Sequence, residues 1–343
     1  MTRAHQPPSV SAVVLAYLDE PWLERCVRDL LASAGVRVEV VLVDNGCTTD
    51  AVDRLAALPG VVVVRPGENL GFAGGCDAGA AVASGEVLAL VNGDAVVRPE
   101  ALAALAAVAL EPGVGIATAS VRLAEDPSRL NTAGNPLHYL GLVWAGGFGC
   151  PATDYASRAE VALASGAACA LRRSLWEELG GFAPEYFAYH EDAELSWRCR
   201  QRGLSVVYVP DAVVVHRYEF SRTARKQYLL ERNRWIFLLT LAGGRTLALT
   251  APALVAFEVA VTVLAAAQGW LPAKARGWAW LLRHAGWVRR RRRRLQAERT
   301  VPDRELARWV TGRFDPANLP LPPGAGFVGG AFDAYWRLVR RLL

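Results

Sequence analysis

The chain has 343 residues, enough to bury a full core and to form either one large domain or one domain plus an appendage. Hydrophobic residues make up 52% and charged residues 21%, which is too polar for a protein with many membrane spans. The net charge of +5 is unevenly spread, because residues 1–216 carry 15 Lys+Arg against 25 Asp+Glu and residues 217–343 carry 23 against 8. This basic C-terminal part is expected to meet an anionic surface, either membrane lipid or nucleic acid.

The cysteines and the N-terminus indicate the cellular compartment. Six cysteines are scattered without a CxxC pair or a metal-ligand spacing, so we interpret them as reduced, mostly buried thiols of a cytoplasmic protein. The first residues lack the apolar core of a signal peptide, and we expect residues 1–8 to be disordered.

Apolar strands alternate with helical segments over the first part of the chain. Pro21 suits the start of the first helix. The strands are expected at residues 9–16, 38–43, 61–64 and 87–91, and the later helices at 51–58 and 76–83. This alternation predicts an α/β fold with a doubly wound, mostly parallel sheet and helices on both of its faces.

Each predicted strand ends in polar residues. In an open α/β sheet these ends share the edge at which ligands bind. The residues are Tyr17 and Asp19, then Asp44 and Asn45, then Asn69, and finally Asn92 and Asp94. Taken alone, the sequence of residues 92–94 favours a surface turn in which Asp94 is merely solvated. Four polar turns at one edge favour a ligand site instead, with Asp94 holding a divalent cation that binds a diphosphate.

The segment 71–75, Gly-Phe-Ala-Gly-Gly, is a weak signal for a phosphate-binding loop, because it lacks a Walker lysine. A loop that is merely rich in glycine is an equal alternative. Asn69 and these glycines would let the backbone approach a ligand closely.

The second half of the predicted domain is less regular. Residues 130–155, rich in Gly, Asn, Pro and aromatics, are expected to form a long functional loop or irregular insert. A helix at 101–110 precedes it. Further strands are expected at residues 115–121, 161–171 (interrupted at 165–166), 204–208 and 212–215, with a helix at 173–179 that stops at Gly180-Gly181.

A second chemical cluster surrounds Glu191, Asp192 and Glu194, at the expected start of a helix. The aromatic residues just before it (Tyr186, Phe187, Tyr189) would exclude water and raise the pKa of one carboxylate, which suits a general base. The alternative is an ordinary capping cluster in which Asp192 is the N-cap.

With both clusters in place, the chain resembles glycosyltransferase family 2, with the GT-A fold, over roughly residues 9–240. Its bacterial rhamnosyltransferase-like members, which build cell-wall or surface polysaccharide, are the most similar. The resemblance rests on a strand ending near Tyr17 and Asp19, on Val-Asp-Asn-Gly at 43–46, on Asn-Leu-Gly-Phe at 69–72, on Asn-Gly-Asp at 92–94, on Gly-Gly-Phe at 180–182 and on Tyr-His-Glu-Asp at 189–192.

The resemblance implies a role for each matching residue. Asp192 would be the base that deprotonates the acceptor hydroxyl, with Glu191 beside it. Asp94 would bind Mg²⁺ or Mn²⁺ together with the donor diphosphate, and His216 would be a further contact to the metal or to the diphosphate. The reaction would be an in-line displacement that inverts the anomeric carbon. Donor-binding residues would be Ala16, Tyr17, Asp19, Asp44, Asn45, Asn69, Gly71, Asn92, Gly93 and Asp94. Residues on the acceptor side would be Gly166, Tyr189, His190 and Trp197.

Two positions depart from the family's pattern. Asn92 stands where the metal-binding triplet begins with Asp, so a single carboxylate carries the metal, and we expect weak metal affinity without nucleotide. Asp77 stands where many relatives have Asn, which puts that donor contact in doubt.

Residues 241–343 form a basic, Trp-rich helical region that we expect to associate with a membrane. Residues 246–267 are uncharged except for Glu258 and are long enough to span a bilayer. A mid-membrane Glu258 and basic flanks on both sides disfavour a span. An in-plane or re-entrant helix pair fits better, with arginines 289–294 on anionic lipid. Tryptophans expected at headgroup depth are Trp270, Trp278, Trp280 and Trp287.

A true span and a soluble helical appendage remain alternatives for this region. Nucleic acid is not expected, because no recognition motif accompanies the arginine run. The expected location is the cytoplasmic face of the inner (plasma) membrane, as a peripheral or monotopic protein.

The sequence thus predicts an inverting glycosyltransferase that moves a sugar from a UDP- or dTDP-sugar, with rhamnose as one candidate, to a lipid-linked or polysaccharide acceptor. One alternative is a nucleotidyltransferase that makes activated sugars, although Tyr17–Pro21 is a poor substitute for the basic glycine-rich loop that holds a triphosphate. Another is a non-catalytic, membrane-bound subunit that binds sugar nucleotides.

Overall fold

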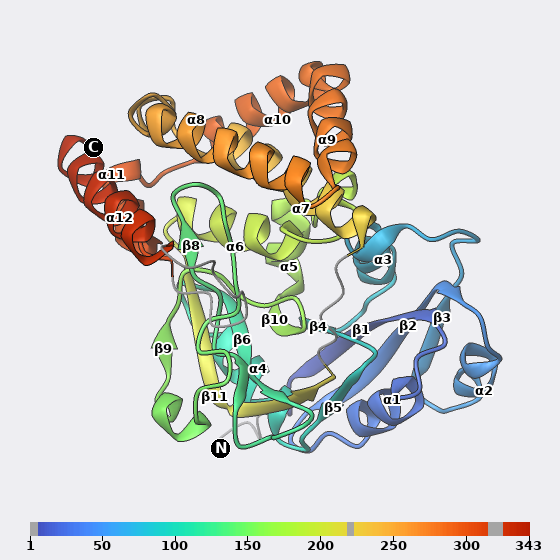
Figure 1. Cartoon of the computed structure of the whole chain (residues 1–343). Coiled ribbons are helices and arrows are strands. Elements are labelled where there is room, and N and C mark those ends of the chain that lie inside the picture. Colours follow the sequence, from blue (N-terminus) through green and yellow to red (C-terminus); the bar gives the residue numbers. More distant parts are fainter. Residues whose placement is uncertain (1–5, 218–222, 315–324) are drawn as a thin grey trace.

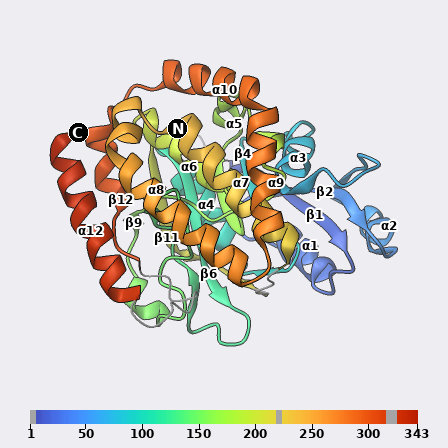
Figure 2. The ribbon, with the colours of Figure 1, turned by 45° about the horizontal axis from the view of Figure 1, so that its top comes forward.

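The computed structural model describes residues 6–217, 223–314 and 325–343, with no side-chain description for 325–328. The disorder expected for residues 1–8 therefore falls mostly outside the described residues. A mixed sheet lies between two groups of helices, and α8, α9, α10 and α12 gather on one side of the molecule (Figures 1 and 2). This arrangement confirms the expected α/β class with a helical C-terminal region.

The main sheet has ten strands, eight of which follow the order β3-β2-β1-β4-β10-β6-β11-β5, with β7 beside β6 and β9 beside β11. The first four strands are mutually parallel, β10 is antiparallel to both β4 and β6, and β11 is parallel to β6. The strands are β1 Ser9–Leu18, β2 Arg37–Cys47, β3 Val61–Val64, β4 Val87–Val91, β5 Ala95–Val97, β6 Val114–Leu123, β7 Leu130–Thr132, β8 Leu137–His138, β9 Ala159–Glu160, β10 Ala168–Arg172, β11 Ser205–His216 and β12 Val310–Thr311.

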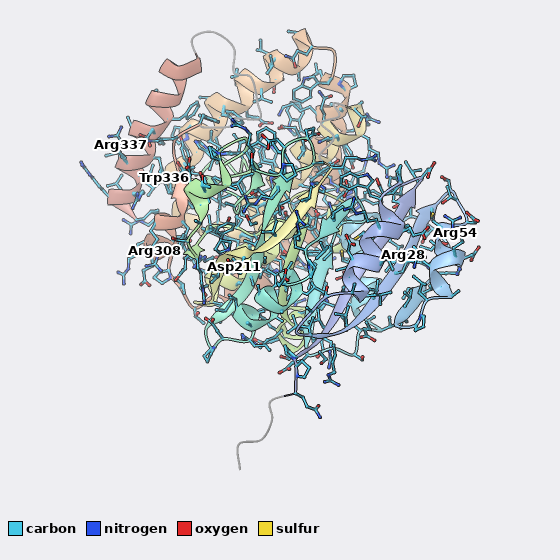
Figure 3. All side chains as sticks on the ribbon, turned by 90° about the horizontal axis from the view of Figure 1, so that it is seen from below. Arg28, Arg54, Asp211, Arg308, Trp336 and Arg337 are labelled. Carbon is cyan, nitrogen blue, oxygen red and sulfur yellow. The ribbon has the colours of Figure 1, made fainter. Side chains whose placement is uncertain are left out.

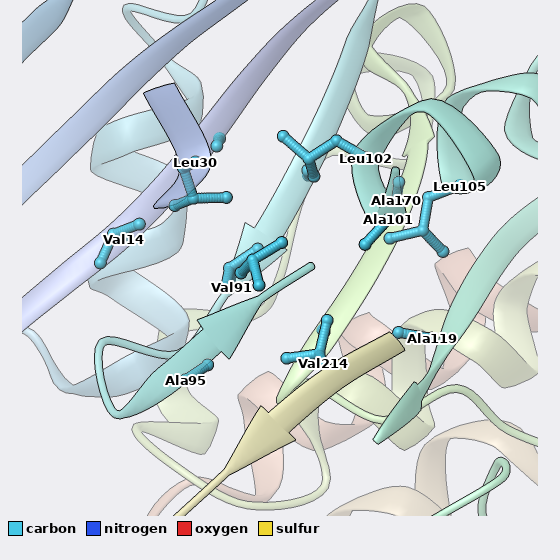
Figure 4. Close-up of a cluster of buried hydrophobic side chains, with 14 of the residues drawn as sticks. Val14, Leu30, Val91, Ala95, Ala101, Leu102, Leu105, Ala119, Ala170 and Val214 are labelled. Carbon is cyan, nitrogen blue, oxygen red and sulfur yellow. The ribbon is translucent and has the colours of Figure 1, made fainter. Parts of the chain in front are cut away.

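Helices cover both faces of the sheet because alternate strand residues point to opposite sides. Val14 belongs to one hydrophobic cluster with Leu30 of α1 and Leu102 of α4 (Figure 4), whereas Val13 belongs to the cluster that includes α3, α5 and α6. The helices are α1 Leu23–Leu31, α2 Ala51–Ala56, α3 Gly71–Ala80, α4 Ala101–Ala109, α5 Arg173–Leu179, α6 Glu191–Gln201, α7 Ala224–Leu241, α8 Gly244–Ala267, α9 Leu271–Arg283, α10 Ala285–Glu298, α11 Asp303–Leu306 and α12 Ala325–Leu342.

The glycine-rich segment 71–75 differs from its prediction as a loop, because it forms the first turns of α3. Its glycines serve packing. A Cβ atom on Gly75 would lie 2.6 Å from Leu15 Cδ2, and one on Gly79 would lie 2.5 Å from Val13 Cγ1. The absence of side chains therefore lets α3 rest directly on β1.

Two other predictions of strands differ from the structure. The strand expected over 161–171 is reduced to β10. The two strands expected at 204–208 and 212–215 form one continuous strand, β11, whose register shifts between Val209 and Val213. Residues 209–211, expected to separate two strands, therefore lie within one strand at a shift of its register.

The long apolar helix α8 is the one helix in the described part of the chain that is long and apolar enough to cross a membrane, with a mean hydropathy of 2.1. Its single acid faces the protein. Glu258 accepts hydrogen bonds from Arg234 (2.6 Å) and from Trp278 Nε1 (2.9 Å), and Lys274 Nζ lies 2.8 Å from it. The charge that complicated a membrane role is thus neutralised on the inner face of α8.

The arginine run of α10 is divided between the body and the solvent. Arg291 pairs with Glu194, Arg292 donates to two carbonyl oxygens at the end of α7, and Arg294 pairs with Glu298. The exposed arginines are Arg289, Arg290, Arg293 and Arg294. The predicted lipid-facing surface therefore retains four of the six expected charges.

Several tryptophans of this region are half-buried between helices. Trp280 lies 4.9 Å from the Arg232 guanidinium and 5.9 Å from Trp287, measured to the ring centroids. Trp278 donates to Glu258. These contacts direct the indoles of Trp278, Trp280 and Trp287 into the packing of α7, α8, α9 and α10. The expected position at lipid headgroups stays a prediction.

Candidate active site

A cavity of about 350 Å³ opens where the carboxyl ends of β1, β2 and β4 meet the start of α3. Because these strands are parallel, their polar ends reach the same edge. Residues at 187–189 and the beginning of α7 form the opposite wall. Predicted site residues that line the cavity are Tyr17, Asn45, Asn69, Gly71, Asn92, Gly93, Asp94 and Tyr189.

Asn45 and Asn69 shape the turn into α3. The Asn45 amide accepts a hydrogen bond from the Leu70 N–H (2.9 Å) and donates to the Gly71 carbonyl (3.1 Å). Asn69 Oδ1 accepts from the Gly71 N–H (2.8 Å). Gly71 has φ +71°, and a Cβ there would lie 2.3 Å from the Phe187 carbonyl oxygen. A side chain at this position would therefore displace the opposite wall of the cavity.

Asp94, which lines the cavity, contacts the buried side chain of His216. Strand β11 runs antiparallel to β5, which pairs His216 with Ala95 and brings the imidazole beside Asp94. The Asp94 Oδ1 to His216 Nε2 distance is 3.1 Å. Two ligands at adjacent corners of an octahedral Mg²⁺ site are about 3 Å apart, because each lies roughly 2.1 Å from the ion. The pair therefore has the spacing of two metal ligands.

The surroundings of His216 orient its ring. Nδ1 lies 3.4 Å from Asn131 Oδ1, and a proton donated there leaves the Nε2 lone pair facing Asp94. The Asn92 amide nitrogen lies 3.2 Å from the same Nε2. Among the described residues no group of three or more His, Cys, Asp or Glu has metal-ligand spacing. The donor set fits a divalent ion whose remaining ligands come from phosphate oxygens and water.

Three predicted donor residues lie outside the cavity wall. Ala16 is fully buried in the core. Asp44 accepts from the Cys47 N–H (3.1 Å) and lies 3.4 Å from Arg65 Nη1. Asp19 is exposed beyond the end of β1.

The carboxylates of Glu191 and Asp192 lie in the first turn of α6, and His190 occupies the N-cap, so the alternative in which Asp192 is the N-cap is wrong. Asp192 Oδ2 accepts from the Gly166 N–H (2.9 Å) and Oδ1 accepts from the Ala193 N–H (2.7 Å). Burial raises the pKa of Asp192 above its ordinary value, against the lowering effect of these bonds.

Glu191 is more deeply buried than Asp192. Burial, and then the charge of Asp192, raise the pKa of the Glu191 carboxyl well above its ordinary value. Its Oε2 has no hydrogen-bond partner among the described residues. Neither carboxylate lines the cavity; Phe72, which does, lies within contact distance of Gly166 beside Asp192. Asp192 is thus beside Gly166 and the Phe72 ring without lining the cavity itself.

The loop before α6 is strained and held by α7. Phe187, Tyr189 and His190 all have positive φ, a conformation that costs on the order of 1–3 kcal/mol per residue. The Asn233 amide donates to three carbonyls of this loop at 2.7–2.9 Å. Arg232 donates to the carbonyls of residues 185 and 186. Helix α7 therefore fixes the backbone that leads into Glu191 and Asp192.

The predicted acceptor-side residues differ in their surroundings. Tyr189 is 37% exposed and faces the cavity. His190 is buried, its Nε2 lies 3.1 Å from the Gly141 carbonyl oxygen, and burial lowers its pKa to about 4. Trp197 is buried against Phe237. Gly166 contacts Asp192 through its N–H.

Two basic side chains that line the cavity were not predicted from the sequence. Arg225 and Lys226 begin α7 and lie over the rings of Phe187 (4.6 Å) and Tyr189 (5.4 Å). Thr223 caps the same helix by accepting from the Lys226 N–H (3.2 Å). The pattern that could have revealed them is Thr223, a helix-capping residue type, followed by the basic residues Arg225 and Lys226 at the start of a helix.

Asp77 lies away from the cavity. Its Oδ1 accepts from the Phe182 N–H (2.9 Å), and burial raises the pKa of this carboxyl to about 7. Asp77, which stands where many relatives have Asn, therefore contacts the Gly-Gly-Phe turn at 180–182 and does not line the cavity.

Comparisons with known proteins agree with this architecture. The succinoglycan biosynthesis protein ExoO of Rhizobium meliloti is 38% identical over 98 residues, which are 28% of this chain and 28% of that protein. The N-acetylglucosaminyl-diphospho-decaprenol L-rhamnosyltransferase of Mycobacterium tuberculosis is 29% identical over 230 residues, covering 60% of this chain and 74% of that protein. The match to ExoO thus spans little more than a quarter of that relative.

A solved structure shows the same fold. The crystal structure of GalNAc-T7 with UDP, GalNAc and Mn²⁺ superposes with a TM-score of 0.56 at 16% identity, over 69% of this chain and 48% of that one. The family model described as "Glycosyltransferase like family 2" matches residues 7–237, about two thirds of the sequence. With its GT-A fold, the chain belongs to glycosyltransferase family 2.

Proposed function

We propose that this protein is a metal-dependent, inverting glycosyltransferase that transfers a sugar from a UDP- or dTDP-sugar, with rhamnose as one candidate, to a lipid-linked or polysaccharide acceptor in cell-wall or surface glycan synthesis. The observation that carries this proposal is the cavity itself. Asp94 lines one wall and lies 3.1 Å from the buried His216, and Arg225 and Lys226 line the other wall. A nucleoside diphosphate is the chemistry that needs both.

The diphosphate would lie between these two walls. Asp94 and His216 would hold Mg²⁺ or Mn²⁺, which when bound stabilises the negative charge of the departing nucleoside diphosphate. Arg225, Lys226 and the N-terminal end of α7 would meet the phosphate oxygens from the other side. Tyr17, exposed at the end of β1, would contact the nucleoside.

Asp192 would act as the base. The acceptor hydroxyl oxygen attacks the anomeric carbon as the bond from that carbon to the diphosphate oxygen breaks, and the hydroxyl proton passes to Asp192. Its raised pKa supports this role, because a base is most effective when its pKa approaches the working pH. The Gly166 N–H holds Oδ2 in place.

The acceptor would be reached at a membrane surface, with the protein on the cytoplasmic face as a peripheral or monotopic protein. Val255, Val259 and Val263 form a stripe on α8 and are each 60–65% exposed. Glu258 lies outside this stripe and pairs with Arg234 of α7. An in-plane helix with its apolar face in lipid is supported by this division, and the relative named for a decaprenol-linked compound is consistent with a lipid-linked acceptor.

Turnover of UDP-, dTDP- and GDP-sugars, measured as release of nucleoside diphosphate with and without EDTA, tests the proposal. We expect release that requires Mg²⁺ or Mn²⁺ and falls at least 100-fold in Asp192→Asn, since this variant keeps the shape but not the base. Unchanged turnover in Asp192→Asn would refute the catalytic role. Binding of a sugar nucleotide without turnover on any acceptor would instead favour a non-catalytic subunit.

A further inference from the structure

A second cavity, of about 360 Å³, lies in the C-terminal region. It is formed by the short helix Ala307–Trp309, by β12 and the two residues after it, and by one face of α12. Figure 3 shows Arg308, Trp336 and Arg337 together at this place. We call it the arginine groove; its lining residues are Arg308, Trp309, Val310, Thr311, Gly312, Arg313, Asp333, Trp336, Arg337 and Arg340. None of them lines the cavity at the end of β4.

The groove carries excess positive charge. Asp333 is its single acid among the lining residues and lies 3.5 Å from Arg313 and 3.2 Å from Arg337. Arg308 and Arg340 form no ion pair with any residue that the structure describes. Four guanidinium groups therefore face one carboxylate, which leaves a net charge of three around the cavity.

The floor of the groove is rigid. Trp336 is 3% exposed, donates from Nε1 to the Val310 carbonyl (3.0 Å) and stacks on Tyr139 with the rings 5.1 Å apart. A Cβ on Gly312 would lie 2.7 Å from Trp336 Cβ, so the backbone lies directly against α12. Strand β12 also pairs with β8. The arginines thus project from a packed floor.

We propose that the arginine groove binds a phosphate or diphosphate group. Arginine is suited to this role because its planar guanidinium donates two parallel hydrogen bonds to phosphate oxygens. A nucleobase fits less well, because both aromatic rings already have partners: Trp336 stacks on Tyr139, and the Arg200 guanidinium lies 3.6 Å from the Trp309 centroid. The phosphate belongs either to a free phosphorylated compound or to a lipid headgroup.

Calorimetry with inorganic pyrophosphate tests the groove, using the full chain in EDTA so that no metal assists binding elsewhere. The double variant Arg308→Gln/Arg340→Gln removes two charges without breaking a described ion pair, and we expect at least a 10-fold loss of affinity. Arg276→Gln/Arg283→Gln, exposed arginines of α9, is the matched control for net charge and should change affinity less than 2-fold.

Vesicles identify the source of the phosphate. Phosphatidylglycerol vesicles are compared with phosphatidylcholine vesicles in a sedimentation assay, with the same two double variants. Pyrophosphate binding that depends on Arg308 and Arg340 identifies a free phosphorylated ligand. Dependence seen only with phosphatidylglycerol identifies a lipid headgroup. Equal behaviour of both variants in both assays, with native unfolding curves, overturns the proposal.

Discussion

Arg291 of α10 forms an ion pair with Glu194 of α6, whose side chain is completely buried. Glu194 also lies 2.8 Å from Arg198 Nη2, so one carboxylate joins two guanidinium groups. Because Glu194 follows Asp192 by two residues, this pair connects the C-terminal helices to the helix that carries the candidate base. Residues after 240 therefore support the site as well as any membrane surface.

Replacing Arg291 with Met should lower the free energy of unfolding by about 3 kcal/mol, because breaking a buried ion pair leaves a charge without its full compensation. Urea unfolding measures this change. Arg290→Met and Arg293→Met are controls from the same run, both exposed, and should stay within roughly 0.5 kcal/mol of the parent. Equal effects at positions 290, 291 and 293 would contradict a structural role for Arg291.

The sequence predicted the strand ends well and the packing poorly. Period-two and period-3.6 patterns are local, so the four parallel strands and the polar edge containing Asn92 and Asp94 could be recognised from the residues alone. The antiparallel placement of β10 between β4 and β6 depends on pairing between distant residues, which no local pattern records. Arg225 and Lys226 could not be predicted for the same reason, because their position in the cavity depends on how α7 packs against distant parts of the chain.

The arginine run shows this limit most clearly. Six consecutive basic residues predict a solvated or lipid-facing surface. On a helix, however, successive residues point in different directions, and Arg291 and Arg292 face the protein body. Their partners, Glu194 and the carbonyls at the end of α7, lie far away in the sequence.

Asn233 should be required as a hydrogen-bond donor. Asn233→Asp keeps the shape but directs a carboxylate at the carbonyls of residues 186, 188 and 189. We expect a loss of about 2–4 kcal/mol in unfolding free energy, because buried acceptors lose their partner. We also expect weaker binding of the sugar nucleotide, because the same loop lines the cavity at residues 187–189. Thr240→Val on the same helix, which loses one internal hydrogen bond, should cost about 1 kcal/mol and leave donor affinity unchanged. An Asn233→Asp protein as stable as the parent would contradict this account.

Gly71 should tolerate no side chain. Gly71→Ala combines a positive φ with a Cβ 2.3 Å from the Phe187 carbonyl oxygen, so we expect at least about 3 kcal/mol of destabilisation and weaker binding of the donor nucleotide. Gly67→Ala is the matched control, because Gly67 also has positive φ (+84°) but a Cβ there meets nothing within 4 Å. It should cost only the strain of the backbone, about 1 kcal/mol. Equal costs in the two variants would exclude the contact with Phe187.

Glu191 should make stability depend on pH. Its raised pKa means that the folded protein keeps this proton while the unfolded chain loses it above the ordinary value of 4.5. The free energy of unfolding of the parent therefore falls as pH rises above that value, by up to about 1.4 kcal/mol per pH unit. Glu191→Gln has no proton to lose at this position. Its free energy of unfolding should therefore equal that of the parent near pH 4 and exceed it by at most about 3 kcal/mol at pH 7. A constant difference between the two proteins from pH 4 to pH 7 would contradict the buried carboxyl.

Asn92→Asp should strengthen metal binding in the absence of nucleotide. In the parent, Asp94 is the carboxylate that contacts His216, and Asn92 directs an amide nitrogen at the His216 Nε2 (3.2 Å). Glu20, the other carboxylate of the cavity lining, pairs with Arg217. A second carboxylate at position 92 adds charge to the donor set, and affinity for hard divalent cations rises with ligand charge. We expect Mn²⁺ to bind at least 10-fold more tightly to Asn92→Asp, measured by calorimetry without nucleotide.

Asp94→Asn provides the opposite test at the same site. It removes the remaining carboxylate next to His216, so Mn²⁺ binding should become undetectable without nucleotide, and metal-stimulated turnover should fall at least 100-fold. The double variant Asn92→Asp/Asp94→Asn restores one carboxylate on the other side of the His216 Nε2 and should recover part of the Mn²⁺ affinity. If Mn²⁺ binding were the same in all three variants and the parent, the ion would be held elsewhere, and the 3.1 Å approach of Asp94 to His216 would be a structural contact alone.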